Sequence, residues 1–232
     1  MSLVERTGTA LVTRPPLLEA MVGRPTRSAA KRAAERAEGM THHRDYEALA
    51  AVALCFQPRR IFEIGTYRGV TSDFFLSLLP ESRVVSIAYE NPRLRIFGGH
   101  SNNSELGRTE IGSMVSPENR PRFTQLYGNS HKLDSKSLRR ECGPFDLVFV
   151  DGDHSRAGVA ADTVLAQEVL ASGGTICWHD ANPKPAYLEV RHFLENELSL
   201  PAAATADDFV GGVACWNSDI ERRLAQNRSA VA

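Results

Sequence analysis

Short apolar runs alternate with segments of helical periodicity over most of this chain. In residues 45–56 apolar side chains recur at helical spacing, and the pattern ends before Pro58. The run Arg60–Ile64 then predicts a strand that leads directly into glycines. Further helices are predicted over 70–79, 135–141, 157–170 and 187–198, and further strands over 83–89, 122–127, 145–150, 175–178, 203–205 and 212–216. A turn at Gly173 and Gly174 is predicted between the helix 157–170 and the strand that follows it.

This order of elements favours an α/β fold. Strands that alternate with helices imply right-handed crossovers, and therefore a doubly wound, mostly parallel sheet with helices on both faces. The predicted strands make this a seven-stranded sheet. In such sheets ligands bind beyond the carboxyl ends of the strands, where the strand order reverses. The residues that follow each strand are therefore the candidates for function.

The first 44 residues differ from the rest and are predicted to form an N-terminal helical extension to a domain over 45–232. Basic side chains outnumber acidic ones there, and Pro15, Pro16 and Pro25 interrupt any long element. Residues 28–38 form an Ala-rich helical stretch with a mostly polar surface. Three interpretations stay open: a solvated arm, a lid over a substrate pocket, or an arm that joins two copies in a homodimer.

Composition and net charge exclude several classes of protein and of partner. The chain has 232 residues, of which 42% are hydrophobic, and this suffices for one large domain with its own core. With 27 basic and 28 acidic side chains, the net charge of -1 provides no field that would attract nucleic acid or an anionic membrane. The longest apolar runs are far shorter than the roughly 20 residues that span a bilayer, and the N-terminus lacks an apolar signal region. We therefore expect a cytoplasmic protein with a small-molecule partner, and neither nucleic acid nor a membrane.

The turn after the first predicted strand is rich in glycine. Its sequence runs from Glu63 through Gly65 to Gly69, in an E-x-G-x-x-x-G pattern. Glycines between a strand and a helix let the backbone approach a ligand closely and present unpaired N–H groups. The pattern is not the dinucleotide-binding G-x-G-x-x-G, and the acid before the first glycine suits a cationic group better than a phosphate. A plain structural turn is the alternative interpretation.

Acids and histidines follow two further strands of the predicted sheet. Asp151, Asp153 and His154 come after one strand, and His179 and Asp180 come after the next. Carboxylates that converge on one cleft repel unless they are protonated, paired with a base or bridged by a cation. Such oxygen ligands suit Mg²⁺, Ca²⁺ or Mn²⁺. Asp153 is also placed to cap the helix that follows, and each histidine is a ligand, a base or an ordinary half-buried imidazole.

Together these features resemble the class I S-adenosyl-L-methionine-dependent methyltransferases. The resemblance rests on the glycine turn and on two motifs, Asp-Gly-Asp-His at 151–154 and Trp-His-Asp at 178–180. The resemblance covers roughly residues 45–216. Within the family, the chain looks like the bacterial branch that includes macrocin-type sugar O-methyltransferases, and it is similar to cephalosporin hydroxylase-like proteins. It implies a Rossmann-like methyltransferase fold and S-adenosyl-L-methionine as the cofactor.

The resemblance also implies which residues hold that cofactor. In the family the acid and glycines of the turn hold its amino-acid end, and groups after the third strand lie near its adenine. Glu90 takes the place of the family's ribose-binding acid, because the expected position at the end of the second strand is Ala88. Asn129 and Ser130 are either adenine neighbours or a helix cap. The full predicted set is Glu63, Gly65, Thr66, Tyr67, Gly69, Thr71, Glu90, Asn129, Ser130 and Asp151.

Related sugar and catechol O-methyltransferases place divalent-metal ligands after the two strands that end in acids here. The resemblance therefore implies a divalent metal, with Mg²⁺ as first choice, and catalytic roles for Asp151, His154 and Asp180. Coordination lowers the pKa of an acceptor hydroxyl and orients it towards the sulfonium methyl. Without a metal, His154 is the general-base candidate. The predicted metal ligands are Asp151, Asp153, His179 and Asp180.

We therefore expect an S-adenosylmethionine-dependent O-methyltransferase that acts on a hydroxyl of a sugar-bearing or other polyhydroxylated metabolite, as in natural product biosynthesis. Two alternatives stay open: a metal-independent N- or O-methyltransferase with a histidine base, and a non-catalytic cofactor-binding protein. The segment 91–121 is longer than an ordinary connection, so part of it is expected to cover the substrate.

Overall fold

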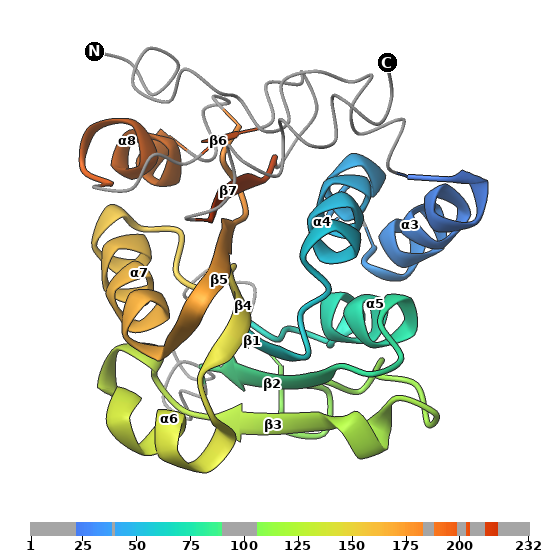
Figure 1. Ribbon diagram of the computed structural model, residues 1–232, viewed down its shortest axis with the longest axis horizontal. Helices are drawn as coiled ribbons and strands as arrows, with labels where there is room; N and C mark the ends of the chain where they lie inside the picture. The colour runs from blue at the N-terminus through green and yellow to red at the C-terminus, as the bar shows by residue number, and fades with distance from the viewer. Residues whose placement is uncertain are drawn as a thin grey trace.

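The computed structural model describes residues 22–38, 40–89, 106–182, 188–198, 203–204 and 212–217. Its seven strands form one sheet in the order β3-β2-β1-β4-β5-β7-β6 (Figure 1). The strands are β1 (Arg60–Ile64), β2 (Arg83–Ala88), β3 (Phe123–Tyr127), β4 (Phe145–Val150), β5 (Leu170–Trp178), β6 (Ala203–Ala204) and β7 (Ala214–Asn217). Neighbours from β3 to β5 are parallel, whereas β7 is antiparallel to both β5 and β6. The predicted doubly wound, mostly parallel sheet is confirmed.

Helices cover both faces of the sheet. In Figure 1, α3, α4 and α5 lie on one side of the central strands, and α6, α7 and α8 lie on the other. Their bounds are α3 (Arg24–Arg36), α4 (His43–Phe56), α5 (Val70–Leu78), α6 (Ser135–Cys142), α7 (Arg156–Val169) and α8 (Leu188–Asn196). Among the described helices, none combines the length and the hydropathy needed to cross a membrane.

Two hydrophobic clusters, one on each face, hold these layers together. Side chains of successive strand residues point to opposite faces, so a strand buried on both sides is apolar throughout. In β4, Val148 and Val150 pack in the cluster beneath α6, α7 and α8, whereas Leu147 and Phe149 pack beneath α4 and α5. This double burial explains the uninterrupted apolar run Leu147–Val150 at the end of β4.

The pair Gly173 and Gly174 lies inside β5 and not in a turn before it, so that prediction is wrong. Leu170 pairs with Phe145 and Thr175 pairs with Leu147, which leaves more residues on β5 than on the strand opposite. The extra residues form a bulge, and Gly173 supplies the left-handed backbone (φ +73°) that the bulge requires. The strand therefore begins at Leu170, where the sequence predicted the end of a helix.

The N-terminal helix α3 starts at Arg24, earlier than predicted. Pro25 occupies its first turn, where the missing N–H costs no hydrogen bond and the fixed φ suits a helix. Ala30 and Ala33 are buried in the same cluster as α4 and α5. Residues 24–36 thus pack against the domain, and a fully solvated arm does not describe them.

Candidate active site

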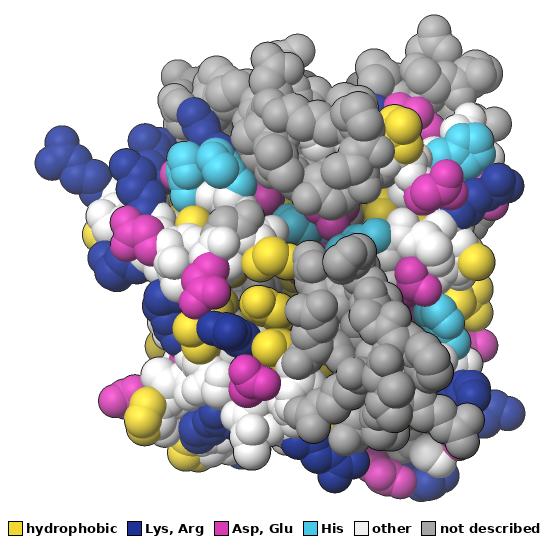
Figure 2. Space-filling model, turned by 180° about the vertical axis from the view of Figure 1, so that it is seen from behind, with side chains coloured by type: hydrophobic (Ala, Val, Ile, Leu, Met, Phe, Trp, Pro, Cys, Tyr) yellow, Lys and Arg dark blue, Asp and Glu magenta, His cyan; other side chains and the backbone are white. Residues whose placement is uncertain are grey.

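A pocket of about 610 Å³ opens at the carboxyl ends of the parallel strands. Its lining includes residues that follow each of the five parallel strands: 65–67 after β1, Tyr89 after β2, 128–131 after β3, 151–155 after β4, and 179–180 after β5. Ala37, Met40, Thr41 and Tyr46 close it from the side of α3 and α4. Figure 2 shows acidic and histidine side chains close together near the middle of one face of the molecule. The pocket therefore lies where ligands bind in open α/β sheets.

Gly65 lies where the strand order reverses, between β1 and β4. Its N–H donates to the Ile87 carbonyl at 2.9 Å, and the Asp151 N–H donates to the Ile64 carbonyl at 2.8 Å. A Cβ added to Gly65 would stand 1.9 Å from the carbonyl oxygen of Asp151, and the residue has a φ of +105°. Only glycine fits there, because the turn passes directly against the backbone of the second site segment.

The Glu63 side chain lies behind this turn, outside the set of residues that line the pocket. It is buried and accepts hydrogen bonds from Ser72 Oγ and from Ser86 Oγ, the latter at 2.7 Å. Burial raises the pKa of Glu63 to about 8, against the opposing effect of these two hydrogen bonds. The carboxyl group thus joins β1, β2 and α5, and it does not face the space where a ligand would lie.

The other predicted residues of the turn divide into two groups. Thr66, Tyr67 and Thr71 line the pocket, whereas Gly69 does not. Gly69 precedes α5 with a φ of +84°, and a Cβ there would stand 2.9 Å from Cα of Gly112. The second glycine of the motif is therefore needed for close packing against a distant segment.

That segment, residues 106–121, packs on the turn and on α5. Its Gly112 N–H donates to the Tyr67 carbonyl at 3.0 Å, and its Ser116 N–H donates to the Asp73 carboxylate at 2.9 Å. The pocket lining contains none of these residues, so the predicted substrate cover does not extend to 106–121. The rest of the predicted cover, 91–105, and the predicted ribose-binding residue Glu90 lie outside the described residues.

Asn129 and Ser130 line the pocket and also make local hydrogen bonds. The Asn129 side chain accepts from the His131 N–H at 2.8 Å, which caps a short 3₁₀ helix over Ser130–Lys132. Ser130 Oγ donates to Asp162 Oδ1 at 2.6 Å. The cap that the sequence offered as one alternative is therefore present, and the other alternative, contact with the adenine of the cofactor, stays a prediction for two residues that line the pocket.

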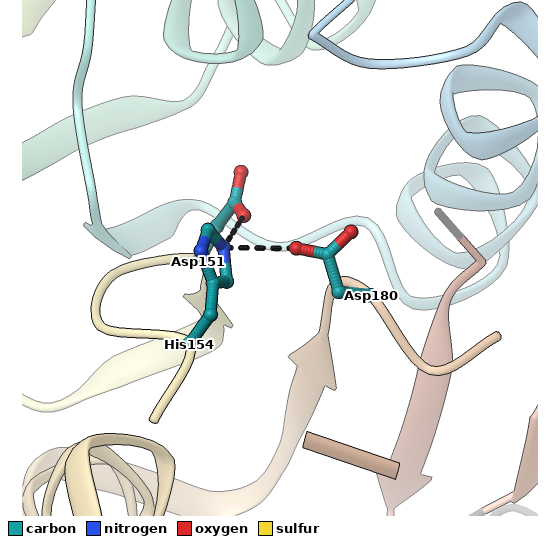
Figure 3. Close-up of side chains that lie close together, drawn as sticks. All are labelled: Asp151, His154 and Asp180. Carbon is teal, nitrogen blue, oxygen red and sulfur yellow. Dashed lines mark ion pairs between the residues drawn. The ribbon is translucent and has the colours of Figure 1, made fainter. Parts of the chain in front are cut away.

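Asp151, His154 and Asp180 all line the pocket, and His154 lies between the two carboxylates (Figure 3). His154 Nε2 lies 2.8 Å from Asp180 Oδ2 and 3.5 Å from Asp151 Oδ1. One ligand atom from each residue falls within 4.8 Å of the other two. Asp180 has a left-handed backbone with a φ of +57°, an uncommon conformation for an aspartate and one associated with functional sites.

His179 lies beneath this trio and contacts carboxylates with both ring nitrogens. Its Nδ1 is 3.1 Å from Asp151 Oδ1 and 3.3 Å from Asp180 Oδ1. Its Nε2 is 3.2 Å from Oδ2 of Asp45, a fully buried residue of α4. Sequence reasoning missed Asp45, because the pattern marks it only as a residue of the first helical turn.

The charges of the cluster stabilise one another. Burial opposes ionisation of Asp151 and Asp180, but the neighbouring His179 charge and the hydrogen bonds from His154 lower the pKa of each carboxyl group below its usual range. Hydrogen bonds to Asp151 and Asp180 raise the pKa of His154 to about 10. Burial alone would lower the pKa of His179, but the Asp151 and Asp180 carboxylates raise it well above its ordinary value. Both carboxylates are therefore ionised at neutral pH.

The cluster fits a divalent cation. Asp180 Oδ1 is buried and lies 3.3 Å from His179 Nδ1, but it makes no well-aligned hydrogen bond with the described residues, so a lone pair stays available to a ligand. Asp151, Asp180 and the nitrogen of His154 form the set of ligand atoms. Asp153 and His179, which the sequence placed among the ligands, lie outside this set. Asp153 instead accepts from the Ser155 N–H at 2.9 Å, at the start of α7, and His179 has carboxylates at both of its nitrogens.

Comparison with known proteins identifies the family. A family model described as a methyltransferase domain matches residues 62–181, more than half of the chain. This chain belongs to the methyltransferase domain family. The matched region contains the Gly65 turn and the whole of the Asp151, His154 and Asp180 trio, so the part of the pocket formed by the strand ends lies within it. A search among curated proteins gives no significant match.

Solved structures share the fold of this methyltransferase domain. The O-methyltransferase TomG from Streptomyces achromogenes, solved with SAM, is 19% identical with a TM-score of 0.56, over 85% of this chain and 91% of that one. An O-methyltransferase from Bacillus cereus in complex with SAH is 17% identical with a TM-score of 0.52, over 87% and 100%. The SAH-bound Podospora anserina methyltransferase PaMTH1 is 16% identical with a TM-score of 0.53, over 85% and 89%. At these identities the likeness establishes the common fold.

Proposed function

We propose that this methyltransferase domain transfers a methyl group from S-adenosyl-L-methionine to a hydroxyl of a small polyhydroxylated molecule, with a divalent cation held by Asp151, His154 and Asp180. One observation carries the proposal: a single pocket runs from the Gly65 turn to the acidic trio at the carboxyl edge of the sheet. A donor and an acceptor bound in it would meet beside the carboxylates.

The pocket suits a cofactor of this class. Its volume of about 610 Å³ falls within the range of sites that enclose small organic ligands. S-adenosyl-L-methionine supplies a methyl group that its sulfonium charge has already activated. The Gly65 turn brings backbone close to the pocket without a side chain in the way, and Asn129 and Ser130 add polar groups to its lining. Asp151, whose backbone lies against Gly65, offers a negative charge to a cationic ligand.

The acidic trio suits activation of a hydroxyl. A divalent cation there would lower the pKa of a bound hydroxyl, and it would favour acceptors with two adjacent oxygens. Asp151 and Asp180 supply the hard oxygen ligands that Mg²⁺ and Mn²⁺ prefer, and His154 supplies a nitrogen that favours Mn²⁺ over Mg²⁺. These side chains orient the acceptor oxygen towards the donor, which is the main task when the electrophile is already activated.

The second candidate is a metal-independent N- or O-methyltransferase in which His154 is the base. The position of His154 at the pocket, with its ring half exposed, favours this alternative. The protonation of His154 does not decide between the two versions, because an imidazole with a pKa of about 10 must lose its proton before its nitrogen can either act as a base or bind a cation. We rank the metal-assisted reaction first because the carboxylates of Asp151 and Asp180 converge with that nitrogen, within 4.8 Å of one another.

The acceptor side of the pocket involves the N-terminal segment. Ala37, Met40 and Thr41, between α3 and α4, line the pocket opposite the strand ends. Of the interpretations of residues 1–44, a lid over the substrate agrees best with this position. The homodimer and the cytoplasmic location expected from the sequence stay predictions.

Two measurements test the proposed function. Isothermal titration with S-adenosylhomocysteine should show binding to the purified protein, and methyl transfer from radiolabelled donor to a panel of catechols and sugar diols should require Mg²⁺ or Mn²⁺. Activity that survives EDTA would favour the His154 base instead. A protein that binds no S-adenosylhomocysteine would contradict both versions.

A further inference from the structure

Asp45 is a buried carboxylate that helix capping explains only in part. It is the third residue of α4, and its Oδ2 accepts the backbone N–H of His42 at 3.2 Å, one half of a capping box. Acids in such caps need only partial shielding from water, since the first helical turn lies at the surface. Here the residue is 0% exposed, and both carboxylate oxygens have further partners. Burial of a charge is costly unless it is paired, so these partners require an explanation.

Those partners lie far away in the chain. Oδ2 of Asp45 contacts His179 Nε2 at 3.2 Å, and Oδ1 accepts the Gly212 N–H at 2.8 Å. His179 follows β5, and Gly212 precedes β7, the antiparallel neighbour of β5. One side chain of the N-terminal part thus joins the start of α4 to two segments beside the site.

The ring of His179 is held in one orientation by these contacts. With Nε2 directed at Asp45, Nδ1 is directed at Asp151 and Asp180, at 3.1 Å and 3.3 Å. The Phe149 ring packs edge-on against the imidazole, with 6.1 Å between centroids, and the His179 backbone N–H donates to the Val150 carbonyl at 3.0 Å. A ring held at both nitrogens and by Phe149 can keep the two carboxylates at a set separation.

We propose that Asp45 is a positioning residue of the active site, which acts through His179 to hold Asp151 and Asp180 at the separation that a divalent cation needs. This proposal deepens the proposed function and rests on it. It makes the start of α4 part of the catalytic apparatus, although Asp45 itself is neither in the pocket lining nor in the cation-site trio. Groups that orient metal ligands from outside typically change metal affinity by about 10- to 100-fold when they are removed.

The test compares Asp45→Ala and Asp45→Asn with the matched control His42→Ala. The control removes the other half of the same capping box, in which the His42 side chain accepts the Arg44 N–H at 3.3 Å, and leaves the Asp45–His179 contact in place. Mn²⁺ binding is measured by electron paramagnetic resonance, and S-adenosylhomocysteine binding by calorimetry. We expect Asp45→Ala to weaken Mn²⁺ binding by about 10- to 100-fold, Asp45→Asn to weaken it less, and both variants to keep the S-adenosylhomocysteine affinity of the wild type. The control should keep both affinities.

A second readout does not depend on the metal. In protein labelled with ¹⁵N-histidine, the proton on His179 Nε2 should give a slowly exchanging signal in the wild type and in His42→Ala, and the signal should be lost in Asp45→Ala. Should Asp45→Ala fail to fold, Asp45→Asn is measured in the same two ways. Unchanged Mn²⁺ affinity and an unchanged His179 signal in a folded Asp45 variant would overturn the proposal. Wild-type protein that binds S-adenosylhomocysteine but no Mn²⁺ would contradict the metal in the proposed function, whereas Mn²⁺ binding that is equally tight in the wild type and in a folded Asp45→Ala variant would overturn the role of Asp45 alone.

Discussion

His154 Nε2 lies 2.8 Å from Asp180 Oδ2, although the two residues follow different strands of the sheet. The carboxyl ends of β4 and β5 are adjacent, and each strand is followed at once by acids and histidine. The imidazole therefore lies between two carboxylates, Asp151 and Asp180. Their negative charges stabilise a positive charge at this place, either on a protonated imidazole or on a metal ion.

Asp180→Asn should reduce turnover by at least about 100-fold, because it removes a charged ligand from the trio and leaves the side-chain volume nearly unchanged. Asp153→Asn is the matched control. Its carboxylate lines the pocket but accepts the Ser155 N–H and lies outside the trio, so we expect a much smaller loss of turnover than for Asp180→Asn. Steady-state methyl transfer with and without EDTA measures both variants. Equal losses in the two would show that Asp153, as the sequence suggested, also serves as a ligand.

Gly65→Ala should destabilise the fold by more than about 3 kcal/mol and abolish S-adenosylhomocysteine binding, because the new Cβ would collide with the Asp151 backbone. Gly173→Ala is the control that distinguishes the effect of this collision from the effect of backbone strain alone. Gly173 also has a positive φ, but nothing lies within 4 Å of its added Cβ, so we expect a loss of about 1 kcal/mol and normal binding. Urea denaturation and calorimetry measure the two effects. A Gly65→Ala protein that binds like the wild type would refute the assigned turn.

Stability should depend on pH through Glu63. Its pKa rises from 4.5 to about 8 in the folded protein, so the folded state holds this proton more tightly than the unfolded state does. The resulting stabilisation is complete below pH 4.5 and is lost as the pH rises through 8, at about 1.4 kcal/mol per unit of pKa difference. Glu63→Gln keeps the hydrogen-bond acceptor and cannot ionise. The free energy of unfolding of the wild type should therefore fall by a few kcal/mol between pH 5 and pH 8.5 relative to this variant; parallel curves for the two proteins would exclude a raised pKa.

Asp73→Ala should loosen α3. The Asp73 carboxylate accepts from Arg36 at 2.6 Å, from Ser116 Oγ at 2.7 Å and from Asn119 at 2.7 Å, which joins the N-terminal helix, α5 and the segment 106–121. Its removal leaves several donors without their acceptor, at a cost of about 3 kcal/mol. Glu38→Gln, which breaks the exposed Glu38–Arg68 pair, should cost less than about 1 kcal/mol. Amide hydrogen exchange in α3 should accelerate in the first variant and not in the second; protection of α3 in Asp73→Ala would show that its alanine face alone holds it.

The central part of the fold was predictable from local pattern. The bounds of β1 and β4 match the prediction, since both strands are short apolar runs ended by the turn residues Gly65 and Gly152. The start of β5 at Leu170 was not predictable, because it depends on a bulged pairing with Phe145 that periodicity does not reveal. Helix α3 begins earlier than expected, because a proline that would disrupt a helix interior is tolerated in the first turn.

The residues of the site were also predictable only in part. Asp151, His154 and Asp180 were predicted to converge, because residues that follow neighbouring parallel strands must share one edge of the sheet. Alternation along β1 leaves open which face Glu63 takes, and its bonds to Ser72 and Ser86 turn it away from the pocket. The Asp45–His179 contact joins residues 134 positions apart, and only the packing of α4 on the sheet brings them together.

The most direct test of the central claim is a crystal structure of the protein with S-adenosylhomocysteine and Mn²⁺. We expect the sulfur in the pocket beside Gly65 and Asp151, and an anomalous manganese peak bound by Asp151, His154 and Asp180 on the side where the methyl group would point. A homocysteine end bound away from the Gly65 turn, or manganese bound away from this trio, would contradict the account.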